Sequence, residues 1–264
     1  LLEMLSYPFL VRAFLVGVLV SLCAALLGTS LVLKRYSMIG DGLSHVGFGA
    51  LAIASALGVA PLAVAVPVVV VAAVLLLRVS QSGRVRGDAA IALISSGALA
   101  VGVLVISLTS GVNTNVSNYM FGSILTISGS DAVLSVILCA AVLVVFTLFY
   151  PRIFDETFAR ATGTKAEGYN MLLAILTAIT VVLGMRMMGA LLISSLIIFP
   201  ALSAMRVFRS FRSVTVCSAV LSVVCFTLGM TLSYALETPS GASVVAVNII
   251  AFALFALAGR LLRR

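Results

Sequence analysis

The only histidine of this chain, His45, lies four residues after an aspartate, Asp41. In an α-helix, residues at i and i+4 share a face, so the carboxylate and the imidazole would point the same way. Together they are a typical ligand set for a divalent transition metal. Charged residues make up only 9% of the chain, and ionisable groups within apolar surroundings are usually functional. The spacing therefore predicts a metal-binding pair.

Two structural alternatives apply to the same residues. Gly40 and Gly42 flank Asp41, so the backbone can turn or unwind there, and Asp41 could cap the helix that follows. His45 could be a core histidine bonded to a carbonyl or a hydroxyl group. Two ligands are also too few for a tight site. A homodimer with this helix on its twofold axis would supply two aspartates and two histidines, which suit Zn, Mn or Fe(II).

The composition excludes a soluble globular protein. The chain has 264 residues, of which 62% are hydrophobic, and a mean hydropathy of +1.29. We expect one polytopic membrane domain over residues 1–264, with no cleaved signal peptide. The net charge of +8 is explained by membrane topology rather than by nucleic acid binding. The four cysteines lie in apolar runs and are expected to be small buried hydrophobic residues.

Apolar runs of about 17–25 residues are long enough to cross a hydrocarbon core of ~30 Å as helices. We therefore predict an all-α membrane protein with eight or nine transmembrane helices. The runs 41–58 and 189–205 are short, and one or both could be broken or re-entrant. The predicted spans are 10–33, 41–58, 60–78, 89–109, 132–150, 170–185, 189–205, 214–236 and 242–261.

Basic residues indicate the orientation. If nine spans alternate, fourteen of the sixteen Lys and Arg residues face one side, and only Arg12 and Arg186 face the other. The positive-inside rule makes the first side cytoplasmic. The N-terminus is then outside and the C-terminus is cytoplasmic.

Two cytoplasmic segments could contact a partner. The loop 151–169 is the longest charged stretch, and it is expected to contain a short amphipathic helix near 154–162. Pro200 is expected to break or kink its segment, and a short basic helix could follow at 201–212. Such a helix could lie on anionic lipid or dock a protein. No GxxxxGK[ST] motif is present, so we expect no ATP hydrolysis by this chain.

Four motifs resemble the permease subunits of the manganese/zinc/iron ABC transporter family, across nearly the whole chain. They are the N-terminal LSYPF of 5–9, LKRYSMIGDGLSH of 33–45, DETFARATG of 155–163, and the segment 187–201, which runs from MMGALL to FPA. The resemblance implies a type II ABC importer fold, related to the importers of cobalamin and siderophores. It also implies no permanently bound cofactor and the import of a divalent ion, Mn²⁺, Zn²⁺ or Fe²⁺.

The same resemblance implies the partners and the site. Such permeases form homodimers in the bacterial plasma membrane, bind two cytoplasmic ATPase subunits, and receive the ion from an external metal-binding protein. Asp41 and His45 correspond to the family's transmembrane metal site. The segment 201–212 is the candidate coupling helix, and 154–163 is a second contact. The residues expected at the ATPase contact are Pro200, Ala201, Ser203, Arg206, Arg209, Asp155, Glu156 and Arg160.

Other functions remain open at this stage. A proton-coupled secondary carrier would use Asp41 and His45 as a relay, and it would not be stopped by vanadate. An importer of a metal chelate such as cobalamin, haem or a siderophore would not need the pair. A purely structural subunit would tolerate replacement of both residues.

Overall fold

The computed structural model describes residues 8–34, 36–81, 87–109, 129–154 and 166–261. Within these ranges the chain is built of helices joined by short connections, and no strand is found in them. The helices are α1 (Pro8–Leu33), α2 (Ile39–Ala56), α3 (Pro61–Gln81), α4 (Gly87–Leu108), α6 (Gly129–Phe154), α8 (Ala166–Met188), α9 (Ala190–Val207), α10 (Phe211–Leu236) and α11 (Ser240–Leu261).

Each predicted apolar run falls on one of these helices, which confirms the all-α fold class. Seven described helices are long and apolar enough to cross a membrane. The described apolar stretch of α6 is shorter, Ala132–Phe146. The remaining helix, α2, has 18 residues and includes Asp41 and His45, whose polarity lowers its mean hydropathy. The one helix that falls short by composition is therefore the one that carries the predicted metal ligands.

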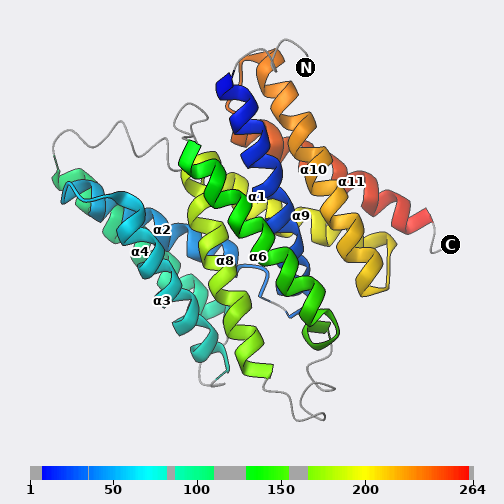
Figure 1. Cartoon of the computed structure of the whole chain (residues 1–264), viewed down its shortest axis with the longest axis horizontal. Helices are drawn as coiled ribbons and strands as arrows, with labels where there is room; N and C mark the ends of the chain where they lie inside the picture. The colour runs from blue at the N-terminus through cyan, green and yellow to red at the C-terminus, as the bar shows by residue number, and fades with distance from the viewer. Residues whose placement is uncertain (1–7, 35, 82–86, 110–128, 155–165, 262–264) are drawn as a thin grey trace.

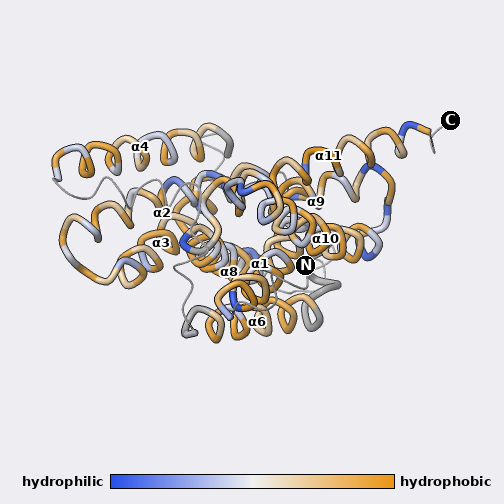
Figure 2. Tube along the Cα trace, turned by 90° about the horizontal axis from the view of Figure 1, so that it is seen from above, coloured by the Kyte–Doolittle hydropathy of each residue, from blue (hydrophilic) through white to orange (hydrophobic). Residues whose placement is uncertain are grey.

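The helices form three neighbouring groups (Figure 1, Figure 2). α2, α3 and α4 lie on one side, α1, α6 and α8 occupy the middle, and α9, α10 and α11 lie on the other side. α1 is central, since it packs against α6, α8, α9 and α10. α2 packs most extensively on α4 and also contacts α3, α8 and α9. The first turn of α2 lies against both α9 and α4, since a β-carbon on Gly40 would lie 2.8 Å from Ile197 Cδ1 and one on Gly42 would lie 2.6 Å from Ile91 Cγ2.

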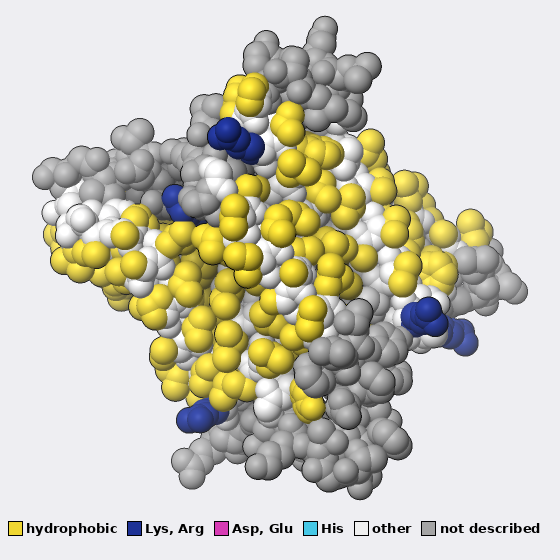
Figure 3. Space-filling model, in the orientation of Figure 1, with side chains coloured by type: hydrophobic (Ala, Val, Ile, Leu, Met, Phe, Trp, Pro, Cys, Tyr) yellow, Lys and Arg dark blue, Asp and Glu magenta, His cyan; other side chains and the backbone are white. Residues whose placement is uncertain are grey.

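The outer surface is apolar, as a lipid-facing surface must be. Figure 3 shows one face on which hydrophobic side chains form a broad continuous area, with Lys and Arg at its margins. Large hydrophobic side chains are exposed along α4, α10 and α11, for example Leu93, Val220 and Leu254. Burial of such side chains against lipid replaces burial in a protein core.

α8 and α9 are separated by a single residue, Gly189. Its φ of 90° and ψ of 155° lie in a region that L-residues rarely adopt. The Gly189 amide still donates to the Met185 carbonyl at 2.9 Å, and the Ile193 amide donates to the Gly189 carbonyl at 3.3 Å. The chain thus changes direction here while both polar groups of Gly189 stay hydrogen-bonded.

The predicted separate helix at 201–212 is wrong. α9 continues through Pro200 to Val207, and α10 begins at Phe211. Packing explains the continuation, because Pro200 and Ala201 are buried and neighbouring helices let a membrane helix tolerate proline. The boundary lies instead at Phe208–Ser210, where the Ser210 hydroxyl accepts a hydrogen bond from the Ser213 amide at 3.2 Å. This is an N-cap for α10. The predicted helix near 154–162 falls almost wholly on residues 155–165, outside the described residues.

Candidate metal site

The start of α2 determines where Asp41 lies. α2 begins at Ile39, its N-cap is Met38, and no side chain caps it. Asp41 belongs to the first turn, where a carboxylate interacts favourably with the helix dipole. The helix continues through Gly40 and Gly42, so the backbone does not unwind beside Asp41. Asp41 is therefore not the N-cap of α2, which was one of the alternatives that the sequence left open.

Asp41 and His45 lie side by side on α2, as the spacing predicts. Asp41 Oδ2 and His45 Nε2 are 3.6 Å apart, which makes an ion pair when the imidazole is protonated. The Asp41 side chain is 40% exposed and the His45 side chain is 24% exposed. Both groups therefore face a shared, partly open space. A carboxylate oxygen and an imidazole nitrogen at this separation can converge on one small cation with modest side-chain rotation.

A third polar group approaches from another helix. Ser194 of α9 is buried, and it contributes to the electrostatic environment of the Asp41 carboxylate. The Ser194 hydroxyl donates to the Ala190 carbonyl oxygen of its own helix at 2.9 Å. Sequence reasoning missed Ser194, because its proximity depends on how α9 packs against α2. Nothing in the spacing of the two segments would have identified it.

The neighbouring helices pack closely around α2. Gly49 faces α4, and a β-carbon built on it would lie 2.7 Å from the Ala98 carbonyl oxygen. On the opposite helix the nearest heavy atom to a β-carbon on Gly102 is the Gly49 α-carbon, at 3.0 Å. Such close backbone approach is typical of small-residue contacts in membrane helices. This close contact fixes the position of α2 along α4.

The pair alone does not complete a metal site. In the described ranges, no group of three or more His, Cys, Asp or Glu residues is placed to hold an ion. The four cysteines are free, and Cys23, Cys139 and Cys225 are buried. A tight site for Zn, Mn or Fe needs about four protein ligands or additional water. Asp41 and His45 of one chain therefore leave ligand positions for water or for further protein groups.

The residues expected at the ATPase contact divide into three groups. Pro200, Ala201 and Ser203 are buried within the chain. Their assignment to the ATPase contact stays a prediction. Asp155, Glu156 and Arg160 lie outside the described residues. Arg206 and Arg209 are exposed, and the Arg206 guanidinium lies 5.4 Å from the centre of the Phe252 ring on α11.

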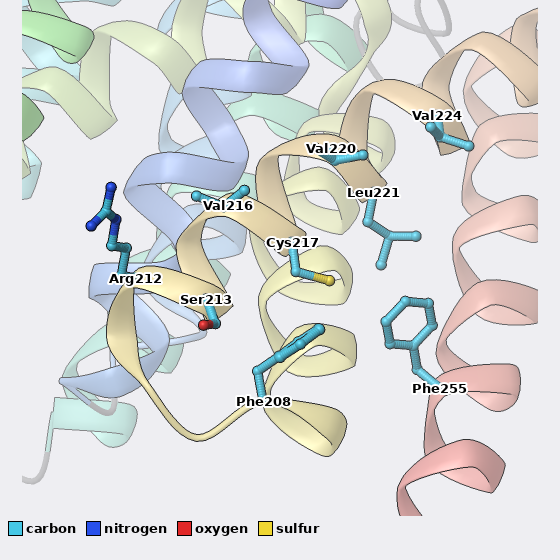
Figure 4. A pocket seen from close by; sticks show the side chains of 9 residues that line it. All are labelled: Phe208, Arg212, Ser213, Val216, Cys217, Val220, Leu221, Val224 and Phe255. Carbon is cyan, nitrogen blue, oxygen red and sulfur yellow. The ribbon is translucent and has the colours of Figure 1, made fainter.

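A groove of about 560 Å³ lies between α10 and α11. Figure 4 shows that Cys217 and Leu221 of α10 and Phe255 of α11 project into the space between the two helices. No carboxylate or imidazole is among the residues that line the groove. The groove therefore offers no ligand set for a hard or borderline cation, and the candidate ion site remains at Asp41 and His45.

Comparison with known sequences identifies several relatives that are named as membrane proteins of metal transport systems. The chain is 30% identical to a probable metal transport system membrane protein of Thermotoga maritima, over 95% of this chain and 90% of that protein. It is 28% identical to the manganese transport system membrane protein MntC of Halalkalibacterium halodurans, over 97% and 88% of the two chains. It is 29% identical to the high-affinity zinc uptake system membrane protein ZnuB of Haemophilus influenzae, over 94% and 97%.

A solved structure gives the same result. PsaBC from Streptococcus pneumoniae, in complex with Fab, contains a chain that matches with a TM-score of 0.83 and 26% identity, over 96% of this chain and 94% of that chain. The model of the ABC 3 transport family matches residues 6–259. The resemblance seen in the sequence motifs is thereby confirmed: this chain belongs to the ABC 3 transport family.

Proposed function

We propose that the chain is the membrane permease subunit of an ATP-driven importer for a divalent transition metal ion, Mn²⁺, Zn²⁺ or Fe²⁺, and that the ion passes Asp41 and His45. The relatives named for manganese or zinc transport support this substrate class. The observation that carries the proposal is the accessible carboxylate–imidazole pair, 3.6 Å apart, in an otherwise apolar helix bundle.

The proposed working form is a homodimer with α2 near the twofold axis. One chain supplies one carboxylate and one imidazole, and a symmetric partner doubles that set to four ligands. The partial exposure of both side chains supports this arrangement, because groups that are fully covered by their own chain could not meet their copies. The symmetry of such an interface is self-complementary.

The ATPase subunits and the delivery protein are proposed on opposite sides of the membrane. The positive-inside pattern puts the N-terminus outside and the C-terminus in the cytoplasm. Arg206 and Arg209, which are exposed at and after the end of α9, are then on the cytoplasmic side. We assign the ATPase contact to these two residues together with Asp155, Glu156 and Arg160. An external metal-binding protein delivers the ion to the other side.

The pair has a clear chemical task in this mechanism. A divalent ion cannot enter hydrocarbon without ligands that replace part of its water shell. Two carboxylates and two imidazoles supply both charge and donor atoms. Rearrangement of the two permease subunits by the ATPases opens the site to one side at a time. The ion must bind weakly enough to leave when the inner side opens.

The test is the metal content of the purified dimer. The wild type and the variants Asp41→Ala, His45→Ala and Val220→Ala are equilibrated with limiting Mn²⁺ or Zn²⁺ and then analysed by mass spectrometry for bound metal. Val220 is 60% exposed on α10, so its variant is the control. We expect about one ion per dimer for the wild type and the control, and loss of binding in both site variants. Wild-type metal content in Asp41→Ala and His45→Ala would contradict the proposal.

A further inference from the structure

The groove between α10 and α11 is apolar along its length and basic at one end. Cys217 and Leu221 of α10 and Phe255 of α11 project into it (Figure 4). Among the described residues that line the groove, Arg212 is the only charged one. It lies where α10 begins, and its side chain extends outward from the helix (Figure 4). The far end of the α10 lining is Val224. This distribution matches a ligand that has a long apolar part and an anionic end.

The length of the groove fits one leaflet of a bilayer. Its lining on α10 runs from Arg212 to Val224, which corresponds to ~18 Å along a helix axis. Half of the hydrocarbon core of a bilayer is ~15 Å thick. An acyl chain of one leaflet can therefore lie along the groove while its headgroup stays at the basic end.

The basic end offers donors that suit a phosphate group. Among the side chains that the structure describes, no carboxylate pairs with Arg212, and a guanidinium can bind a phosphate through two parallel hydrogen bonds. The Ser213 hydroxyl accepts a hydrogen bond from the Ser210 hydroxyl at 2.9 Å, which leaves its own hydrogen to donate. In the orientation proposed above, this end of α10 lies at the cytoplasmic face, where the leaflet carries anionic lipids.

The position of the groove favours a lipid over a second copy of the chain. The proposed dimer has α2 near its twofold axis. α2 belongs to the group of helices on one side of α1, whereas α10 and α11 lie on the other side (Figure 1). A copy that meets α2 is therefore remote from the groove. The exposed side chains beside the groove, such as Val220 and Leu254, are apolar and suit contact with lipid.

We propose that the groove between α10 and α11 is a binding site for one anionic phospholipid of the cytoplasmic leaflet. One acyl chain lies between the two helices, and the phosphate binds the Arg212 guanidinium and the Ser213 hydroxyl. Basic pockets between membrane helices on the cytoplasmic side bind lipid headgroups in this way. The inference uses the proposed orientation, and it does not depend on which ion is transported.

The experiment is native mass spectrometry of the purified full-length protein, with phosphatidylglycerol or phosphatidylcholine of the same acyl chains added. Arg212→Gln removes the charge, and Cys217→Phe fills the groove. Arg78→Gln is the control for charge, since Arg78 is exposed in the last turn of α3, far from the groove. Leu228→Phe is the control for the added ring, since Leu228 is exposed on α10 outside the groove. Thermal unfolding confirms that each variant is folded.

We expect the wild type to bind phosphatidylglycerol about fivefold more tightly than phosphatidylcholine. Arg212→Gln should lose this preference, Cys217→Phe should lose the bound lipid, and both controls should behave as the wild type. The inference is overturned if the wild type binds the two lipids equally, if Arg212→Gln keeps the preference, or if either control has the same effect as its counterpart. If Cys217→Phe instead separates a dimer into single chains, a second copy covers the groove and the lipid site is wrong.

Discussion

α2 and α10 differ in how much of their surface is covered by other helices. Most residues of α2 are buried by α3, α4, α8 and α9. Fewer than half of the residues of α10 are buried, and its outer face presents Val216, Val220 and Val224. α2 carries both proposed ligands, whereas the exposed face of α10 is apolar.

This difference shows where a membrane chain can place charge. A helix enclosed by protein on most sides can hold a carboxylate and an imidazole, because neighbouring helices and a partner face them instead of lipid. A helix that faces lipid along much of its length has no such freedom. Enclosure by other helices, rather than apolar length, therefore indicates which helix can carry the proposed ligands.

The largest expected effect concerns the buried side of α10. Phe226 is 1% exposed and packs beside Phe14 of α1, with ring centres 6.2 Å apart. Phe226→Ala should lower the free energy of unfolding by about 3–5 kcal/mol because it leaves a cavity. Val220→Ala, on the lipid-facing side, should have a much smaller effect. Unfolding in detergent measures both, and equal losses would show that the two sides of α10 are not distinct.

The enclosure of α2 can be tested at Gly49. A β-carbon there would lie 2.7 Å from a backbone oxygen of α4, so Gly49→Ala should destabilise the protein by about 1–3 kcal/mol through overpacking. Gly97 of α4 is the control, because a β-carbon there meets nothing within 4 Å. Gly97→Ala should be neutral or stabilise by up to about 1 kcal/mol, since alanine is the better helix former. If both substitutions lower the free energy of unfolding, or both raise it, Gly49 is not more tightly enclosed than Gly97.

Low pH should reduce metal uptake, because His45 of α2 becomes protonated. A protonated imidazole cannot bind a metal, so protons compete with the ion at His45. Free imidazole has a pKa of about 6.5, and metal uptake at low ion concentration should fall by up to about tenfold per pH unit below the pKa of His45. Uptake by vesicles with ATP supplied inside at constant pH provides the measurement. Uptake that is unchanged down to about pH 5 would argue against His45 as a ligand.

The smallest effect is expected for a hydrogen bond between helices. The Ser222 hydroxyl of α10 donates to the Ser21 carbonyl of α1 at 2.9 Å. Ser222→Ala should cost about 0.6 kcal/mol, the average for such bonds in membrane proteins. Thr227 instead donates to Val223 within α10, so Thr227→Ala is the control and should cost less. An equal cost would mean that the bond between α1 and α10 contributes nothing beyond a local one.

Much of the fold could be predicted from the sequence because lipid imposes simple rules. Apolar length alone located every described helix, since backbone groups in hydrocarbon must be bonded within helices. The expectation of a separate helix after Pro200 was wrong, because packing of the buried residues around Pro200 preserves α9. The N-cap of α10 at Ser210 was not identified from the sequence.

The candidate site was predictable only in part. The i, i+4 spacing of Asp41 and His45 was sufficient to place them on one face, because it needs only helix geometry. The approach of α9 to the first turn of α2 was not predictable, since it depends on the packing of Gly40 against Ile197. Contacts between segments far apart in sequence require the tertiary structure.

Gly189 limits which substitutions and insertions the chain can accept between α8 and α9. One residue with φ of 90° sets the direction of α9 after α8, and any other residue there would add backbone strain of about 1–3 kcal/mol. An insertion beside it would rotate every later residue of α9 by ~100° about the helix axis. Length variation is therefore poorly tolerated at this corner, although polar loops elsewhere can change length at little cost.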